Sequence, residues 1–178
     1  MSIRTREYIE TTFGQMLNEQ SLSRITVKEI ASRCDISRNC FYYHFEDIPS
    51  LLTKTVGDEV NKAIASVPDS ATLDEAVCQL VDFARTRKTA IMHIHFSDNR
   101  QIVEDCLLKT CRYITDKFMQ QFRSKNALSE EDAALLKKFY SYELFGLSMD
   151  WLNHHMMYNI EDDFRRLGQL VEKYVRSA

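Results

Sequence analysis

The sequence predicts an all-α protein built from two successive helical parts. Residues that interrupt helices are scarce, because only 4 of the 178 residues are Gly and only 2 are Pro. Hydrophobic residues make up 44% of the chain and recur at helical spacing, with no useful length of alternating pattern. The stretch SVPDSAT holds the second proline and is the best place for a boundary. We therefore expect one domain over residues 1–65 and a second over residues 66–178.

Composition limits the class of protein and its compartment. No run of about eighteen apolar residues occurs, so we expect no helix that spans a membrane. The N-terminus MSIRTREYIE lacks the apolar core of a signal peptide, and the 5 cysteines are an odd number. Both features favour reduced thiols in the cytoplasm. The net charge is −3 and residues 1–56 hold equal numbers of basic and acidic residues, so any nucleic-acid binding must rest on a few placed groups.

The first third of the chain is predicted to begin with two helices. Residues 3–19 place apolar residues at helical spacing with charged residues elsewhere, which indicates an amphipathic helix. Thr26 and Glu29 have the spacing of a capping box, in which the hydroxyl accepts from the third amide and the carboxylate reaches back. This box begins a second helix that ends near residue 33.

A third helix follows after a tight turn. Residues 34–36 form the turn, and Ser37 caps the helix, which runs to about residue 45. Phe41 and Phe45 are four apart, share one face and are assigned to the core. A helix, a three-residue turn and a short second helix rich in side-chain donors have the shape of a helix-turn-helix.

The rest of the chain is predicted to be helical. Pro49 suits the first turn of a fourth helix, which apolar residues continue to about residue 64. Ser129, followed by acidic residues, is a strong helix start. Five further helices are expected over residues 72–86, 88–96, 99–124, 129–158 and 160–176.

The helix over residues 129–158 is apolar on two faces, and such a helix must be covered on both. One face consists of Leu135, Phe139, Tyr142, Gly146 and Met149, and the other of Leu136, Tyr140, Leu144, Leu147 and Trp151. In a domain this small, a second copy of the chain is the expected cover, and the last helix offers a matching stripe. The predicted homodimer interface consists of Tyr140, Leu144, Leu147, Trp151, Phe164, Leu167 and Val171.

The segment TVKEIASRCDISRNCFYYHFEDIPSLL resembles the N-terminal signature of the TetR family of bacterial transcriptional regulators. The segment YELFGLSMDWLNHH is similar to the penultimate, dimerising helix of that family. The resemblance implies an N-terminal helix-turn-helix DNA-binding domain followed by a helical ligand-binding and dimerisation domain. It also implies a dimer on a palindromic operator in double-stranded DNA, with a small-molecule effector that changes DNA affinity.

The chain departs from the family pattern at three positions. Asp35 stands where a turn glycine is common, and Asp can adopt the left-handed conformation at some cost. Asn39 stands where the recognition helix usually has a small residue. Ile48 replaces the lysine that usually opens the fourth helix, and Glu46 and Asp47 precede it, so a usual phosphate contact is missing.

The third helix carries the candidates for contact with DNA. Arg38 can pair with guanine O6 and N7, Asn39 can pair with adenine N6 and N7, and Tyr43 is the third candidate for base edges. The competing interpretation is a solvated helix surface, and for Tyr42 it is packing against the first helix. Phosphate contacts are assigned to Thr26, Lys28, Ser37, Tyr42 and His44.

A ligand pocket, a metal site and a catalytic site leave weaker signals. The spacing of the pocket candidates fits ordinary core equally well; they are Met92, Phe96, Leu107, Cys111, Tyr142 and Phe145. The histidines of IMHIHF and of NHHMM point to different sides of a helix, so we expect no metal site and no cofactor. Glycine-rich phosphate loops and nucleophile elbows are absent from the sequence, so we expect no enzyme.

Two functions remain open at this point. The first is a dimeric, ligand-responsive DNA-binding regulator, by family default a repressor of nearby genes. The second is a helical interaction protein that keeps the fold but acts through a protein partner, for example as a co-activator, with weak or no DNA binding of its own. The missing lysine and the neutral N-terminal charge motivate the second.

Overall fold

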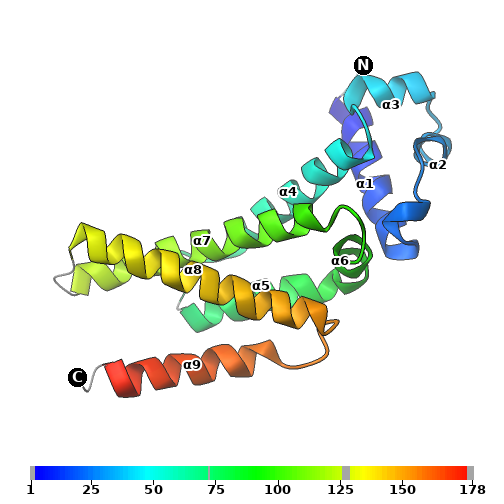
Figure 1. Cartoon of the computed structure of the whole chain (residues 1–178). Coiled ribbons are helices and arrows are strands. Elements are labelled where there is room, and N and C mark those ends of the chain that lie inside the picture. The colour runs from blue at the N-terminus through cyan, green and yellow to red at the C-terminus, as the bar shows by residue number, and fades with distance from the viewer. Residues whose placement is uncertain (1–2, 72, 126–128, 176–178) are drawn as a thin grey trace. The chain divides into compact units, whose positions relative to one another are not determined.

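The computed structural model describes residues 3–71, 73–125 and 129–175, and every regular element in these ranges is helical (Figure 1). The prediction of an all-α fold is therefore confirmed. The α-helices are α1 (Ile3–Glu19), α2 (Val27–Arg33), α3 (Arg38–His44), α4 (Ile48–Ser66), α5 (Leu73–Thr86), α6 (Lys88–His95), α7 (Arg100–Lys125), α8 (Glu130–Asn153) and α9 (Ile160–Val175). A short 3-10 helix, η1 (Leu22–Arg24), lies between α1 and α2.

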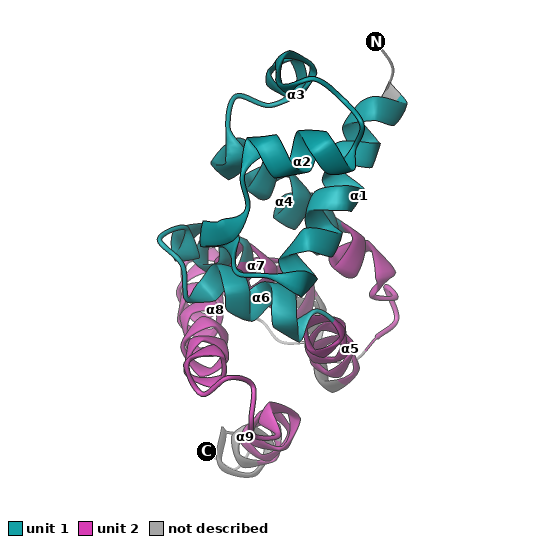
Figure 2. Cartoon of the chain, turned by 90° about the vertical axis from the view of Figure 1, so that its right-hand side faces the viewer, with its two compact units in different colours: residues 1–61, 87–106 teal, residues 62–86, 107–178 magenta. Residues whose placement is uncertain are grey.

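The chain divides into two compact units, which Figure 2 shows in teal and magenta. Unit 1 comprises residues 1–61 and 87–106, and unit 2 comprises residues 62–86 and 107–178. Unit 1 therefore contains α6 as well as the N-terminal helices, while α4 and α7 contribute residues to both units. The domain boundary between residues 65 and 66 stays a prediction, because compactness does not test whether each part folds alone.

Unit 1 is organised around large apolar side chains that solvent does not reach. α1 packs against α2 and α6, and α2 packs against α3. The fully buried side chains are Ile9, Phe13 and Met16 from α1, Ile30 from α2, Phe41 from α3, and Leu51 and Leu52 from α4. Each contributes about 1.5–3 kcal/mol through burial. This core fixes the positions of α2 and α3.

Unit 2 is closed by contacts between α5, α8 and α9. α9 packs against both α5 and α8, and Val67, Ala71 and Ala76 form a small core with Leu80 and Phe118 around it. Arg85 on α5 pairs with Glu161 on α9 at 2.6 Å. Within the described residues, no helix is both long enough and apolar enough to cross a membrane.

α8 ends earlier than predicted. It begins after Ser129, the predicted helix start, whose hydroxyl accepts from the amide of Asp132, but it stops at Asn153 and not near residue 158. His155 and Met156 both have φ of 55°, in the left-handed region. The amide of Met156 donates to the carbonyl of Trp151 at 2.8 Å, and that of His155 donates to Leu152 at 2.9 Å. These paired bonds are a Schellman motif, which ends a helix here without the usual glycine.

Candidate nucleic-acid interface

The turn between α2 and α3 is a Schellman motif, like the one at the end of α8. Asp35 has φ of 51°, so the expected left-handed aspartate is present. Its amide donates to Ser32 at 3.3 Å, and the amide of Ile36 donates to the carbonyl of Ala31 at 3.0 Å. This Schellman motif satisfies the last carbonyls of α2 and turns the chain directly into α3.

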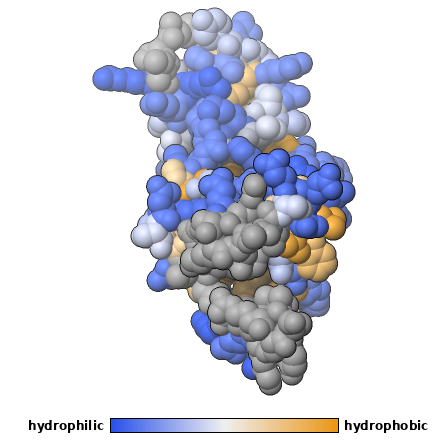
Figure 3. All heavy atoms as spheres, turned by 90° about the vertical axis from the view of Figure 1, so that its left-hand side faces the viewer, coloured by the Kyte–Doolittle hydropathy of each residue, from blue (hydrophilic) through white to orange (hydrophobic). Residues whose placement is uncertain are grey.

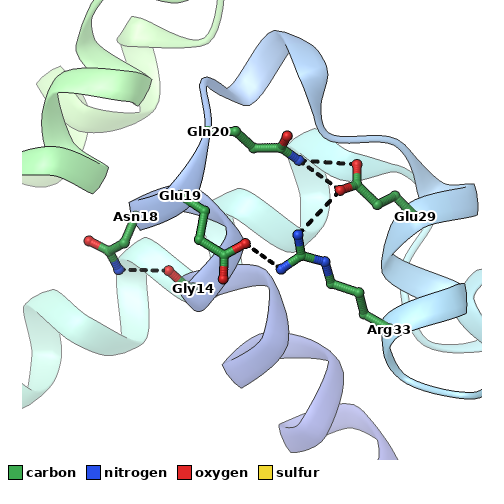
Figure 4. A network of polar contacts seen from close by, with 6 residues as sticks. All are labelled: Gly14, Asn18, Glu19, Gln20, Glu29 and Arg33. Atoms are coloured by element: carbon green, nitrogen blue, oxygen red, sulfur yellow. Dashed lines mark hydrogen bonds and ion pairs between the residues drawn. The ribbon is translucent and has the colours of Figure 1, made fainter.

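Both helices of the motif begin with the predicted caps. Thr26 Oγ1 accepts from the amide of Glu29 at 3.2 Å, and Ser37 Oγ accepts from the amide of Cys40 at 3.1 Å. The return half of the capping box takes a different form. Gln20 Nε2 donates to both carboxylate oxygens of Glu29 at 3.0 Å, so this carboxylate links α2 to the end of α1 (Figure 4).

α3 separates its apolar side chains from its polar ones. Phe41 is fully buried and Phe45 is 5% exposed, as the sequence predicted for core residues. The guanidinium of Arg6 lies 5.3 Å from the centre of the Phe45 ring, which ties α3 to α1. Arg38, Asn39, Tyr42 and Tyr43 are exposed; Tyr43 is 71% exposed and Tyr42 54%. The Tyr42 ring also meets Phe41 edge-on at 5.5 Å, so it combines packing with an accessible hydroxyl.

The residues assigned to phosphates differ in their accessibility. Thr26, Lys28 and Ser37 are exposed. A capping hydroxyl that accepts from an amide can still donate its own proton to a phosphate oxygen. His44 is less suited to contact a phosphate in this conformation, because its Nε2 is buried and has no hydrogen-bond partner among the described residues.

The start of α4 accounts for Asp47, one of the two acidic residues that precede Ile48. Asp47 Oδ1 accepts from the amide of Ser50 at 2.7 Å, and Ser50 Oγ accepts from the amide of Asp47 at 3.2 Å. These reciprocal bonds cap α4. Ile48 and Pro49 occupy the first two helical positions, and Pro49 has no amide proton to offer. The beginning of α4 therefore offers few donors to a phosphate.

The residues considered for an effector pocket fall in different units. Met92 and Phe96 belong to unit 1, and Phe96 is 57% exposed. The other four belong to unit 2: Leu107 and Phe145 are half-buried, Cys111 is buried and Tyr142 is 48% exposed. Burial raises the pKa of the Cys111 thiol to about 12, so this group stays neutral.

Unit 2 also contains a pocket that the sequence did not indicate. Its volume is about 460 Å³, and it is lined by Asp69, Tyr113, Asp116, Lys117 and Gln120. None of these residues was a pocket candidate. Within this lining Lys117 Nζ pairs with Asp69 at 3.4 Å, and it also donates to the carbonyl of Pro68 at 2.5 Å.

The predicted dimer interface needs one correction. Trp151 is 3% exposed within a single chain, so its side chain has no surface left for a second copy to cover. Tyr140, Leu144, Leu147, Phe164 and Leu167 are half-buried, and the side chain of Val171 lies outside the described residues. The exposed apolar residues are on the other face of α8, where Leu135 is 66% exposed and Phe139 is 61% exposed.

Apolar residues also break the mainly hydrophilic surface in the view of Figure 3. The sequence showed both faces of α8 but could not decide between them, because periodicity does not tell which face meets the rest of the same chain.

The fold and the capped turn define a helix-turn-helix protein. Two family models match the sequence. The model of the bacterial regulatory proteins of the tetR family matches residues 15–53, and a model described as a transcriptional regulator C-terminal region, also of TetR type, matches residues 71–173. The chain belongs to the TetR family of bacterial regulatory proteins.

Solved structures share this fold. The dihydroxyacetone kinase operon activator DhaS has a TM-score of 0.75 at 16% identity, over 98% of each chain. The fatty acid degradation regulator FadR from Bacillus halodurans has a TM-score of 0.65 at 15% identity, over 96% of each chain. A tetR family transcription regulator from Shewanella sp. PV-4 has a TM-score of 0.52 at 18% identity, over 84% of this chain and 86% of the other. No curated protein sequence matches significantly.

Proposed function

We propose that the protein is a homodimeric, ligand-responsive transcriptional regulator that binds a palindromic operator through α3. The observation that carries the proposal is the exposure of Arg38, Asn39 and Tyr43 on a short helix that Phe41 anchors in the core. Such a helix fits the major groove, and these side chains carry the donors and acceptors that read base edges. The proposed phosphate contacts are Thr26, Lys28, Ser37 and Tyr42, with His44 as a weaker contact.

Dimerisation is part of this proposal. Two recognition helices bind successive major grooves when they are about 34–36 Å apart, which one chain cannot achieve. The exposed stripe of α8, Leu135, Phe139 and Tyr142, supports a second copy as its cover. The half-buried residues of α8 and α9 named above belong to the interface in this proposal as well.

The effector acts, in this proposal, through the spacing of the two recognition helices. A small molecule that binds one conformation more tightly shifts the population, and the DNA affinity changes with it. The family default is repression of nearby genes. The solved structure of DhaS is named an operon activator, so activation is the alternative outcome to be tested.

The start of α4 favours a second candidate function. The carboxylate of Asp47 already occupies the amide of Ser50, and Ile48 supplies no charge for a phosphate. Weak DNA binding would follow, and the protein would then act through a protein partner, as a co-activator does. Affinity and its dependence on salt separate the two functions.

The test is a fluorescence-anisotropy titration of the pure protein against the DNA upstream of its own gene, at two salt concentrations. Scrambled DNA is the sequence control, and the Arg38→Ala, Tyr42→Ala double variant is the protein control. Tight, salt-sensitive binding that the double variant loses would support the regulator. If the folded double variant binds the same DNA unchanged, or if wild type does not distinguish it from scrambled DNA, the search moves to a partner protein.

A further inference from the structure

A side chain of α6 caps the end of α1. Nδ1 of His93 lies 2.7 Å from the carbonyl oxygen of Leu17. A carbonyl oxygen only accepts, so Nδ1 carries the proton and donates it. Because α1 ends at Glu19, the Leu17 carbonyl is one of the last four of its helix and has no amide of that helix to bond. The imidazole supplies that partner from another helix.

The same end of α1 holds α2. Arg33 Nη1 donates to Glu19 at 2.5 Å, and Gln20 Nε2 donates to Glu29 at 3.0 Å (Figure 4). Glu29 is also the residue whose amide Thr26 caps. The turn that α6 caps therefore carries two side chains, Glu19 and Gln20, whose polar bonds tie α1 to α2 in addition to the buried core.

α6 has a second anchor that does not involve α1. Arg87, the residue that precedes α6, donates from Nε to Glu59 on α4 at 2.8 Å. α6 is thus bonded near its first turn to α4, and the side chain of His93 bonds its later turn to α1.

We propose that His93 is a positioning residue for the helix-turn-helix, because it caps α1 at the turn whose Glu19 and Gln20 hold α2. Without the donor, a part-buried carbonyl loses its partner and the last turn of α1 loosens. The polar bonds of Glu19 to Arg33 and of Gln20 to Glu29, which add to the hold of the buried core on α2, then weaken. The effect on DNA affinity rests on the proposed function, whereas the effect on α2 exists in the free protein.

The first experiment is amide hydrogen exchange in the full chain without DNA. His93→Phe keeps a ring but removes the donor, while His93→Asn keeps a donor near the position of Nδ1. We expect His93→Phe to speed exchange in α2 and the last turn of α1 by about 10-fold, a coupling typical of residues in one network. His93→Asn should show a much smaller effect.

A matched control comes from unit 2. Nδ1 of His154 lies 2.8 Å from the carbonyl of Asp150 at the end of α8, and this carbonyl also accepts from the amide of His154 at 3.0 Å, so His154→Phe removes a histidine–carbonyl bond that lies within unit 2. This variant should leave exchange in α2 unchanged. A histidine that only stabilised unit 1 would speed exchange in α4 as much as in α2, and that result would overturn the proposal. Unchanged exchange in α2 would also overturn it.

Two further measurements keep the outcomes separate. If His93→Phe does not fold, His93→Gln, whose amide nitrogen takes the place of Nε2 and not Nδ1, carries the same expectation. Operator titration then compares His93→Phe with His93→Asn, and only the former should bind the upstream DNA about 10-fold more weakly. Absence of DNA binding by wild type would reject the proposed function, while the exchange result would still decide the role of His93.

Discussion

The indole Nε1 of Trp151 donates a hydrogen bond of 3.0 Å to the carbonyl oxygen of Tyr158, and this bond spans the turn between α8 and α9. The guanidinium of Arg85 lies 5.6 Å from the centre of the same indole and also pairs with Glu161. Trp151 therefore joins α8, the turn and α5 within one chain. These contacts hold the turn that precedes α9 against the end of α8.

Trp151→Phe tests this role. The variant removes the donor, shrinks a buried side chain and leaves the Tyr158 carbonyl without this partner. We expect the free energy of unfolding to fall by about 2–4 kcal/mol in urea titrations, from the lost hydrogen bond and the new cavity together. His154→Ala, which changes an exposed side chain three residues away, is the control and should alter stability little. A change in self-association with no change in unfolding would contradict the intrachain role.

Leu135→Ser with Phe139→Ser tests the exposed face of α8. Because both side chains are exposed in the single chain, the double variant should keep its helical circular dichroism while the proposed dimer dissociates more readily. Removing two apolar anchors should raise the dimer dissociation constant by at least about 30-fold in sedimentation velocity. Met157→Ser changes a residue that is 78% exposed in the α8–α9 turn and serves as the control. An unchanged dissociation constant would exclude this face of α8 as the dimer interface.

Ile48→Lys tests whether a missing contact limits DNA affinity. The added ammonium can reach a phosphate where α4 otherwise offers few donors. We expect tighter operator binding and a slope of log affinity against log salt that is steeper by about one. Ile48→Gln adds polarity without charge and should leave the slope unchanged. An identical salt-dependence slope for both variants would show that residue 48 does not contact a DNA phosphate.

Asp35→Gly tests the left-handed residue at the end of α2. Glycine adopts a φ near 51° without the steric penalty that an L side chain meets there. We expect the free energy of unfolding to rise by up to about 1 kcal/mol, whereas Asp35→Ala should lower it. Asp35→Asn, which removes the charge but tolerates the same backbone, should behave like wild type. The explanation would be refuted if the stability of the variants depended on the charge of residue 35 and not on the backbone conformation that the residue allows.

Cys111 predicts a dependence of stability on alkaline pH. Its pKa rises from 9.0 to about 12 on folding because burial disfavours the thiolate. The folded state therefore keeps a proton that the unfolded state loses, so this contribution is complete below pH 9 and is lost between pH 9 and about 12. Comparing urea titrations of wild type and Cys111→Ala at pH 8 and pH 10.5 isolates it. The gap in stability between the two proteins should narrow at the higher pH; a constant gap would argue against burial as the cause.

The sequence predicted α2 and α3 almost to the residue because their signals are local. Thr26 and Ser37 each cap a helix within three residues, and no distant contact is needed to recognise them. The end of α8 had no such signal, since His155 and Met156 adopt left-handed backbone without glycine or asparagine. The role of Trp151 was equally hidden, because it depends on where α5 and α9 pack and not on helical period.

Polar contacts with residues far along the chain were also not predictable from local sequence signals. The spacing of Thr26 and Glu29 predicts a capping box, and the cap is present. The carboxylate of Glu29 is nevertheless held by Gln20, a residue whose position is set by the end of α1. His93 carried no recognisable signal for its contact with α1, since its partner is a backbone carbonyl that becomes available only where a helix ends.

The reciprocal bonds between Asp47 and Ser50 mean that α4 carries its own counter-ion at its positive end. The helix is therefore preorganised in the free protein and does not need an anion from outside to complete its first turn. Contact with a polyanion gains no ordering of α4 and must be driven by side chains elsewhere.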